Sequence, residues 1–540
     1  MNETIRIIYI QPSAFYGETD FCIEPFLRIS NYLNVNGYKL NGHILEEYLD
    51  LRFEDLPNYA PENISKYRKS LKGLLNDVYI RFPFDVVAIS CYTSFSYLNT
   101  LEVVNMIKHF INPLGNIVVG GVHTTIIPDD FYPENIPSYF NEFYPEKTTP
   151  IDYIVIDEGE IPFFHFIQNL LNKTLKKRED LGKRPIILER ELLENLDDLP
   201  PLNLELFRKY ASAIEKLKHF HILFSRGCAF RCKFCNNSET YIKGSRIIRH
   251  RSLENCIADL KTIINTDWLK IEHLFIADSI FCPKRSRKRK FFEELDKIYH
   301  NISFRIYVFE RIETCSIDDL KAYKKYNMIP GFGLESCSKK LLFRMGKING
   351  KNAIQIKKGI DNYLDKTINL IKISNKIDLP INFFYLLGMP GTDQESLNES
   401  WSFFFEKTRD KEILMEKYKI NLQFYKYSLF PGNTIYNKGE EMFGAIYYYR
   451  DWWKIFDKNQ AFYSLLFDPS KELSCLQITN KLDDFVSKIF KTQSEVGNPF
   501  YTVRFMVFLR RVFNTIIKMC EETLNNVGDT HSYDELEMIK

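Results

Sequence analysis

Three cysteines near the middle of the chain have the spacing that most clearly indicates chemistry. Cys228, Cys232 and Cys235 lie in the segment Ser-Arg-Gly-Cys-Ala-Phe-Arg-Cys-Lys-Phe-Cys, with the spacing C-x3-C-x2-C. Three thiolates on one loop can bind three irons of a four-iron cluster, a one-electron donor whose potential the protein tunes. The fourth iron then has no protein ligand, so a small molecule could be bound and reduced there. We therefore predict a [4Fe-4S] cluster with one open iron.

Other roles for these cysteines fit the sequence less well. A structural zinc site usually has four ligands, often as two C-x2-C pairs. No second pair and no His-x3-5-His follows, and the next cysteines, Cys256 and Cys282, are isolated. A disulfide within one short loop would add little stability. Zinc or redox-active thiols remain the alternative.

The first third of the chain contains short apolar runs separated by longer mixed segments. Such runs predict strands covered on both faces, and the mixed segments between them predict helices, so that βαβ units form a parallel sheet. We therefore expect a Rossmann-like, doubly wound domain over residues 1–175. The expected strands are Ile5–Ile10, Leu40–Leu45, Asp85–Ser90, Asn116–Gly120 and Asp152–Ile156.

Small, hydroxyl and acidic residues follow four of these strands. Ligands of such sheets bind beyond the carboxyl ends of the strands, where small residues let the backbone approach closely. No G-x-G-x-x-G follows the first strand, so the dinucleotide fingerprint is absent. The four segments are Gln11-Pro12-Ser13, Ser90-Cys91-Tyr92-Thr93, Gly120-Gly121-Val122-His123 and Asp157-Glu158-Gly159-Glu160.

A second alternation of strands and helices surrounds the cysteines. After a connector at 176–218, six βα units over residues 219–435 predict a partial (β/α)6 barrel, and residues 436–540 lack the alternation and predict a mainly helical region. Chemistry in βα barrels lies at the carboxyl ends of the strands. The expected strands are His221–Ser225, Ile271–Ile276, Ser303–Val308, Gly331–Leu334, Ile381–Leu387 and Asn421–Tyr427.

The cysteine loop, with Phe234 before its last cysteine, resembles that of the radical S-adenosylmethionine (SAM) enzymes. The resemblance implies that SAM binds the open iron and that further SAM contacts lie at the strand ends. Asp278 would meet the amino group of SAM, Glu335 and Ser336 of the Gly-Leu-Glu-Ser element would meet the ribose, and the Gly-Met-Pro-Gly element would lie at the adenine. The implied SAM contacts are Phe234, Asp278, Glu335, Ser336, Gly388 and Pro390.

The N-terminal segments resemble the cobalamin-binding domain of one subfamily of these enzymes. Asp157 stands where that subfamily usually has glycine, and the D-x-H-x-x-G motif is absent, so cobalt would have no His ligand from that motif. A doubly wound domain that has lost its ligand is the alternative. The implied cobalamin contacts are Gln11, Pro12, Ser90, Tyr92, Thr93, Gly120, Gly121, His123, Glu158, Gly159 and Glu160.

The resemblance implies a radical reaction on a small molecule or peptide. The cluster would cleave SAM to a 5′-deoxyadenosyl radical, and methylcobalamin would methylate an unactivated carbon of a peptide or natural-product substrate. An electron donor such as flavodoxin or ferredoxin would be the partner. The alternatives are a cobalamin radical enzyme that does not methylate, catalysing ring contraction, cyclisation or oxidation, and a sensor that binds both cofactors without turnover.

Composition argues against several other classes of protein. The 540 residues carry a formal net charge of +2, so no overall field favours nucleic acid or membranes. Eleven cysteines without a repeating spacing do not form the framework of a secreted protein. The N-terminus has no signal-peptide pattern and no run is apolar enough for a membrane span, so we expect a soluble cytoplasmic protein. The basic run Arg285–Lys290 is expected to be the solvated start of a helix.

Overall fold

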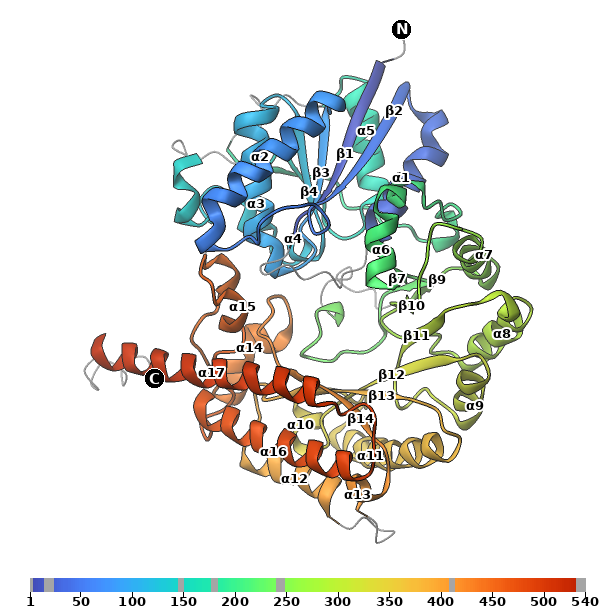
Figure 1. Ribbon diagram of the computed structural model, residues 1–540, viewed down its shortest axis with the longest axis vertical. Coiled ribbons are helices and arrows are strands. Elements are labelled where there is room, and N and C mark those ends of the chain that lie inside the picture. Colours follow the sequence, from blue (N-terminus) through green and yellow to red (C-terminus); the bar gives the residue numbers. More distant parts are fainter. Residues whose placement is uncertain are drawn as a thin grey trace.

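The computed structural model describes residues 3–13, 24–143, 150–175, 183–238, 248–406 and 413–530. Its framework is two parallel six-stranded sheets, one in the N-terminal domain and one in the central domain, and helices of the C-terminal region pack beside the second (Figure 1). The predicted α/β fold class is confirmed. Among the described helices, none is long and apolar enough to cross a membrane.

The N-terminal sheet has the strand order β2-β1-β3-β4-β5-β6, with all neighbours parallel. The order reverses between β1 and β3, which is the switch point where doubly wound sheets bind ligands. Helices α1 (Glu24–Asn36) and α5 (Glu160–Leu171) pack together, as do α2 (Ile64–Arg81) and α3 (Tyr97–Met106). The strands are β1 Glu3–Gln11, β2 Gly42–Asp50, β3 Val86–Ser90, β4 Asn116–Gly120, β5 Tyr153–Ile154 and β6 Ile186–Ile187.

Two details of this domain differ from the sequence prediction. The second strand runs over Gly42–Asp50 instead of Leu40–Leu45, because Tyr48 and Leu49 at its end are buried in the core while its start is half-exposed. The sheet also gains the short strand β6 from the segment expected to be only a connector. The first residues of that connector, 176–182, lie outside the described residues.

The central sheet has the order β14-β13-β12-β11-β10-β7, again with parallel neighbours. Six parallel strands followed by helices form the expected partial barrel. The strands are β7 His219–Ile222, β10 His273–Ile276, β11 Arg305–Glu310, β12 Met328–Glu335, β13 Asn382–Leu387 and β14 Asn421–Lys426. The main outer helices are α7 Leu253–Ile264, α8 Arg285–Asp296, α9 Ile317–Lys325, α11 Ala353–Lys376 and α12 Gln394–Phe405.

The basic run at 285–290 is only partly solvated. It begins α8 as expected, but Lys288 is fully buried and its ammonium pairs with the carboxylates of Glu310 and Asp319. Because a buried cation is costly without a partner, these two acids make the position tolerable. The prediction of a solvated face is therefore wrong for Lys288.

The C-terminal region contacts both preceding domains. Helix α16 (Cys475–Glu495) packs on the barrel through Phe485, whose ring lies 6.2 Å from that of Phe404. Trp453 donates from Nε1 to Oδ2 of Asp130 in the N-terminal domain at 2.7 Å. The remaining helices are α14 Thr434–Phe443, α15 Gln460–Tyr463 and α17 Val503–Thr530. The C-terminal region therefore contacts the N-terminal domain as well as the barrel.

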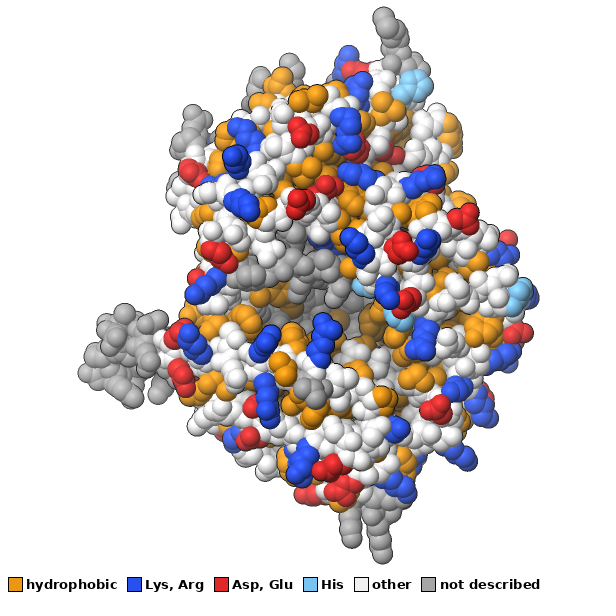
Figure 2. All heavy atoms as spheres, in the orientation of Figure 1, with side chains coloured by type: hydrophobic (Ala, Val, Ile, Leu, Met, Phe, Trp, Pro, Cys, Tyr) orange, Lys and Arg blue, Asp and Glu red, His pale blue; other side chains and the backbone are white. Residues whose placement is uncertain are grey.

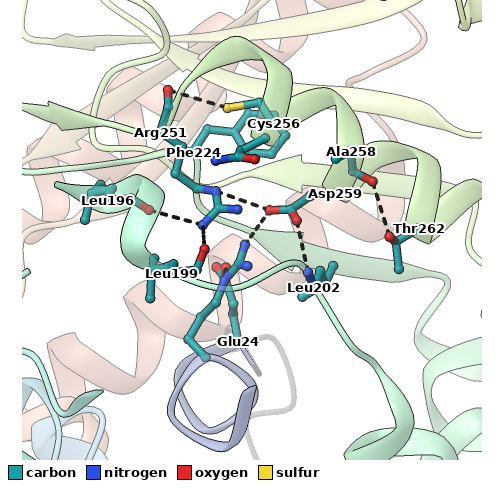
Figure 3. Close-up of polar contacts among 12 residues, drawn as sticks. Glu24, Leu196, Leu199, Leu202, Phe224, Arg251, Cys256, Ala258, Asp259 and Thr262 are labelled. Carbon is teal, nitrogen blue, oxygen red and sulfur yellow. Dashed lines mark hydrogen bonds and ion pairs between the residues drawn. The ribbon is translucent and has the colours of Figure 1, made fainter. Parts of the chain in front are cut away.

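A buried ionic network joins the first domain to the barrel (Figure 3). Asp259 of α7 accepts from Nη2 of Arg28 on α1 at 2.9 Å and lies 3.5 Å from Nε of Arg251. Arg251 donates from Nη1 to the carbonyls of Leu196 and Leu199 in the connector, at 3.2 and 3.1 Å. All three charged side chains are nearly inaccessible. Three segments far apart in sequence are thus fixed by one set of charges.

Candidate functional site

A cavity of about 330 Å³ lies between the N-terminal domain and the barrel, where the carboxyl ends of both sets of strands face each other. The N-terminal domain contributes seven of the eleven residues implied as cobalamin contacts: Ser90, Tyr92, Gly120, Gly121, Glu158, Gly159 and Glu160. The barrel contributes residues next to the cysteine loop and at the end of β10: Leu223, Ser225, Arg226, Asn237, Ala277 and Ser279.

Glycine is required at the edge of this cavity. Gly121 has φ +116°, and a Cβ there would lie 2.5 Å from the carbonyl oxygen of Cys91. The loop after β4 therefore touches the end of β3, leaving its backbone open to the cavity. A side chain at 121 would both strain the backbone and separate the two strand ends.

The other four implied cobalamin contacts do not line the cavity. Gln11 donates from its side-chain amide to the carbonyl of Pro12 at 3.2 Å, and Thr93 begins a short helical turn. His123 is fully buried inside the domain, with Nδ1 2.9 Å from Oγ of Ser94. Contact of these residues with cobalamin stays a prediction.

The two glutamates of the Glu-Gly-Glu segment bind the arginine that precedes the cysteine loop. Arg226 lies 2.9 Å from Oε2 of Glu158 and 2.5 Å from Oε1 of Glu160. Glu158 also pairs with Arg249. Burial opposes ionisation of Glu160, but the charge of Arg226 lowers its pKa below the ordinary value. Because 226 and 249 belong to the paired strands β8 (Ser225–Arg226) and β9 (Arg249–His250), the N-terminal domain anchors both.

The cysteine loop is fixed by main-chain bonds on two sides. The amide of Lys233 donates to the carbonyl of Met345 at 2.9 Å, and the amide of Ile435 donates to the carbonyl of Lys233 at 3.0 Å. After the last cysteine, the side-chain amide of Asn237 also donates a hydrogen bond to Oγ of Ser279, beyond the end of β10, at 2.9 Å. The loop is therefore placed over the carboxyl ends of the barrel strands.

Cations surround the cysteine thiols. Arg311 donates from Nη1 to Sγ of Cys232 at 3.6 Å. Burial, followed by the nearby Cys232, raises the pKa of Cys235 to about 12, and Cys228 also acts on it. Burial raises the pKa of Cys228, while Arg311 and Lys347 oppose the rise. The three thiols are thus close enough to influence one another, and thiolates there need compensating positive charge.

Within the described ranges, no three His, Cys, Asp or Glu side chains converge closely enough to hold a single metal ion. Binding of a cluster by Cys228, Cys232 and Cys235 stays a prediction.

The residues implied as SAM contacts lie in several different surroundings. Asp278 accepts through Oδ1 from the amides of Phe224 and Ser225, at 2.7 and 2.9 Å, and burial raises its pKa to about 7. Glu335 has φ +63° and pairs with Lys347 at 3.0 Å, near enough to Cys235 to act on its pKa.

The other implied SAM contacts are distributed around the barrel. Ser336 and Gly388 line a separate cavity of about 230 Å³ beside α12 and α16. Pro390 is buried beside Gly439, and Phe234 packs against the main core. Contact of all these residues with SAM stays a prediction.

Sequence reasoning missed three cations of the site: Arg226, Arg311 and Lys347. A positional signal for the first two was present, because Arg226 precedes the loop by two residues and Arg311 directly follows β11. Lys347 gave no such signal, since it lies in an irregular segment and reaches Glu335 only through the fold.

Comparisons with known proteins agree with this geometry. Residues 222–403 match the model of the Radical SAM superfamily. An uncharacterized methyltransferase, PH0819, from Pyrococcus horikoshii is 24% identical over 333 residues, which cover 60% of this chain and 64% of the relative. The chain therefore aligns with slightly less than two thirds of that relative.

Two solved structures have a similar fold. The cobalamin-dependent SAM radical enzyme OxsB, solved with aqua-cobalamin bound, gives a TM-score of 0.61 at 15% identity, over 98% of this chain and 75% of that one. The radical SAM methyltransferase TsrM from Kitasatospora setae, solved with tryptophan substrate and a SAM analogue, gives 0.54 at 15% identity, over 80% and 74%. The likeness shows a shared fold, and the predicted resemblance is confirmed.

Proposed function

We propose, since the chain contains a radical SAM domain and has the fold of cobalamin-dependent members, that it is a cobalamin-dependent radical SAM methyltransferase. Its substrate would be an unactivated carbon of a peptide or natural product. The observation that carries the proposal is the cavity bounded by the strand ends of both domains.

An unactivated C–H bond calls for radical chemistry. A positioned base contributes about 10²–10⁴-fold and acts on groups with some acidity, which such a carbon lacks. When bound, the cluster supplies the electron for reductive cleavage of SAM, and cobalamin supplies a methyl group. An electron donor such as flavodoxin or ferredoxin would replenish the electron. The residues of this chain hold and orient these groups.

The cysteine side of the cavity suits a cluster. Cys228, Cys232 and Cys235 provide three thiolates, and the Arg311 guanidinium beside Cys232 offsets part of their charge. Lys347 adds a second cation while its ammonium pairs with Glu335. That pair leaves the second carboxylate oxygen of Glu335 without a bond to Lys347, as an acceptor for a ribose hydroxyl.

The other side of the cavity suits a flat cofactor with a polar edge. Gly120 and Gly121 expose backbone, and Ser90 and Tyr92 add hydroxyl groups. Val122 and Val155 contribute apolar surface to the same lining. His123 is held by Ser94 and Asp130 inside the domain, which agrees with a cobalamin bound without a His ligand from this segment.

Ion pairs between the domains hold the two sides of the cavity in place relative to each other. Arg226 is held by Glu158 and Glu160, so the start of the cysteine loop cannot move away from the N-terminal domain without breaking both pairs. Radical chemistry requires reacting groups in fixed positions and exclusion of water. These contacts provide the fixed positions.

The test is anaerobic purification followed by iron and sulfide assays, a cobalamin spectrum, and incubation with SAM labelled in its methyl group. We expect about four irons per chain, a cobalamin spectrum, and reductive cleavage of SAM. A variant with Cys228, Cys232 and Cys235 changed to alanine should lose iron, whereas Cys256→Ala should retain it. Reconstituted protein that stays free of iron and cobalamin contradicts the proposal; SAM cleavage with no labelled methyl group in any product contradicts methylation alone.

A further inference from the structure

The inner face of the barrel is more exposed than its outer face. Along each strand alternate residues point to opposite sides. Those that face the helices, such as Leu274, Ile306 and Phe424, are buried. Phe309 and Tyr425, which face the barrel axis, are 38% and 50% exposed. A βα barrel normally packs its interior with side chains, so this barrel has an open lumen instead.

The lumen is a cavity of about 800 Å³ with two chemically different ends. Aromatic side chains form the wall toward the carboxyl ends of the strands: Phe275, Tyr307, Phe309, Phe384 and Tyr425. Polar side chains from the starts of the strands form the opposite mouth: His219, His273, Arg305, Asn382 and Asn421. Phe500 of the C-terminal region also lines the cavity. Figure 2 shows the molecule hollowed at its centre, below the N-terminal domain.

Strand β11 gives the length and direction of this lumen. Arg305, Tyr307 and Phe309 lie on its inner face, and at about 3.3 Å per residue the first and last are about 13 Å apart. The next residue in this alternation, Arg311, contacts the sulfur of Cys232. The aromatic end of the lumen therefore lies toward the cysteine loop, and Arg305 lies at the far mouth.

The aromatic side chains of this wall pack on one another. The rings of Phe275 and Tyr307 stack at 4.8 Å with 14° between their planes, whereas the planes of Phe309 and Phe384 are inclined by 61°. Gly331, next to Phe309 on the neighbouring strand, leaves room for the ring of Phe384, because a Cβ at 331 would lie 2.6 Å from that ring. Such a lining favours an aromatic ligand, because aromatic rings attract one another in offset-stacked and edge-to-face arrangements.

Arg305 is exposed, its side chain interacts with that of Tyr307, and it forms no ion pair with a carboxylate among the described residues. Its neighbour His273 has a buried Nδ1 with no hydrogen-bond partner, and burial lowers the pKa of that imidazole below the ordinary value. Arg305 is thus the side chain of the mouth that is always positively charged, and its planar guanidinium favours bidentate binding of an anion.

We propose that the lumen binds a planar aromatic or conjugated molecule that carries a carboxylate or a similar anionic group. Its flat part lies against Phe309, Phe384 and Tyr425, nearest the cysteine loop, and its anionic group lies at Arg305. This inference rests on the proposed function and names the substrate class of that reaction.

Fluorescence anisotropy of two matched probes tests the lumen with the full-length chain. The probes are 1-pyrenebutyrate, a flat ring system with a carboxylate, and 1-pyrenebutanol, which is the same without charge. We expect the anion to bind at least tenfold more tightly. Arg305→Gln should weaken 1-pyrenebutyrate about tenfold and leave 1-pyrenebutanol unchanged. Tyr425→Leu should weaken both, and Arg285→Gln, an exposed arginine on α8, should weaken neither.

Three results would overturn the inference: no binding of either probe, equal loss of both in Arg305→Gln, or displacement of 1-pyrenebutyrate by decanoate as effectively as by 9-anthracenecarboxylate. Melting temperatures of the variants show that they fold. Iron content and SAM cleavage are measured on the same preparations. Probe binding that depends on Arg305 in protein without SAM cleavage would refute the proposed function alone, and the opposite pattern would refute only the lumen site.

Discussion

Replacing Asp259 with asparagine should destabilise the protein strongly while keeping the shape of the side chain. Asp259 is fully buried and provides the negative charge for Arg28 at 2.9 Å and for Arg251 at 3.5 Å. Asparagine could still accept from the amide of Leu202, which Asp259 does at 3.2 Å. The substitution therefore removes charge and leaves the local hydrogen bond possible.

The magnitude follows from the burial of the two arginines. Removing one partner of a buried ion pair costs about 3–5 kcal/mol, because the remaining charge stays uncompensated away from water. Arg28 keeps a second partner in Glu24, whereas Arg251 keeps the connector carbonyls of Leu196 and Leu199 and the weaker influence of the Asp197 charge. We expect a loss in the free energy of unfolding within that range.

Urea unfolding followed by tryptophan fluorescence measures this loss. The matched control is Asp318→Asn, which removes an exposed pair with Arg285 in which both side chains are more than 70% exposed. Exposed pairs contribute about 0–1 kcal/mol, so the control should change stability by less than about 1 kcal/mol. A second variant combines Asp259→Leu, Arg28→Met and Arg251→Met with Glu24→Met, because Glu24 is the buried partner of Arg28. This variant should regain much of the stability, since none of the four charges is left buried.

The reasoning is refuted if Asp259→Asn unfolds within about 0.5 kcal/mol of the control. It is also refuted if the apolar quadruple variant is less stable than Asp259→Asn, since the network would then contribute through its bonds and not through compensation of buried charge.

Three further predictions concern the site. Gly121→Ala should abolish the cobalamin spectrum and cost at least about 1–2 kcal/mol, because of its positive φ and a carbonyl 2.5 Å from the new Cβ, whereas Gly73→Ala, with open space around it, should do neither. Asp278 has a pKa of about 7 in the folded protein, so it stabilises the fold at low pH and loses that contribution as pH rises through 7. The free energy of unfolding of Asp278→Asn, measured from pH 5 to 8, should therefore fall less with pH than that of the unchanged protein, and an equal pH dependence would refute the effect. Arg311→Gln should shift the reduction potential of the cluster in an electrochemical titration and Arg311→Lys should shift it less, while identical potentials would remove its electrostatic role.

The sequence predicted where most strands lie, but not which residues of distant elements contact one another. Apolar runs located most strands, and Asp85–Ser90 and Asn116–Gly120 closely match β3 and β4, because continuous burial on both faces leaves a local pattern. Strand β6 was missed because two half-buried residues leave no such pattern. Lys288 was misjudged because its burial depends on Glu310 and Asp319, which lie on other elements.

The same limit applies to the candidate site. Glu158 and Glu160 could be chosen from their motif, but their pairing with Arg226 joins residues more than sixty positions apart. His123 was chosen from a motif whose glycines line the cavity, yet its own side chain turns inward to Ser94. A motif therefore identified the correct loop, while the direction of each side chain depended on tertiary packing.

The hydrogen bond from Trp453 to Asp130 has a consequence for access to the reaction centre. It completes a closed set of contacts among the three parts of the chain. The first domain binds Arg226 of the barrel, the barrel packs against the C-terminal region, and that region donates a hydrogen bond back to the first domain. A hinge about any one boundary would have to break a second boundary as well. The mouth beside Arg305 and Phe500 offers a small diffusing compound a route into the lumen that opens none of these boundaries.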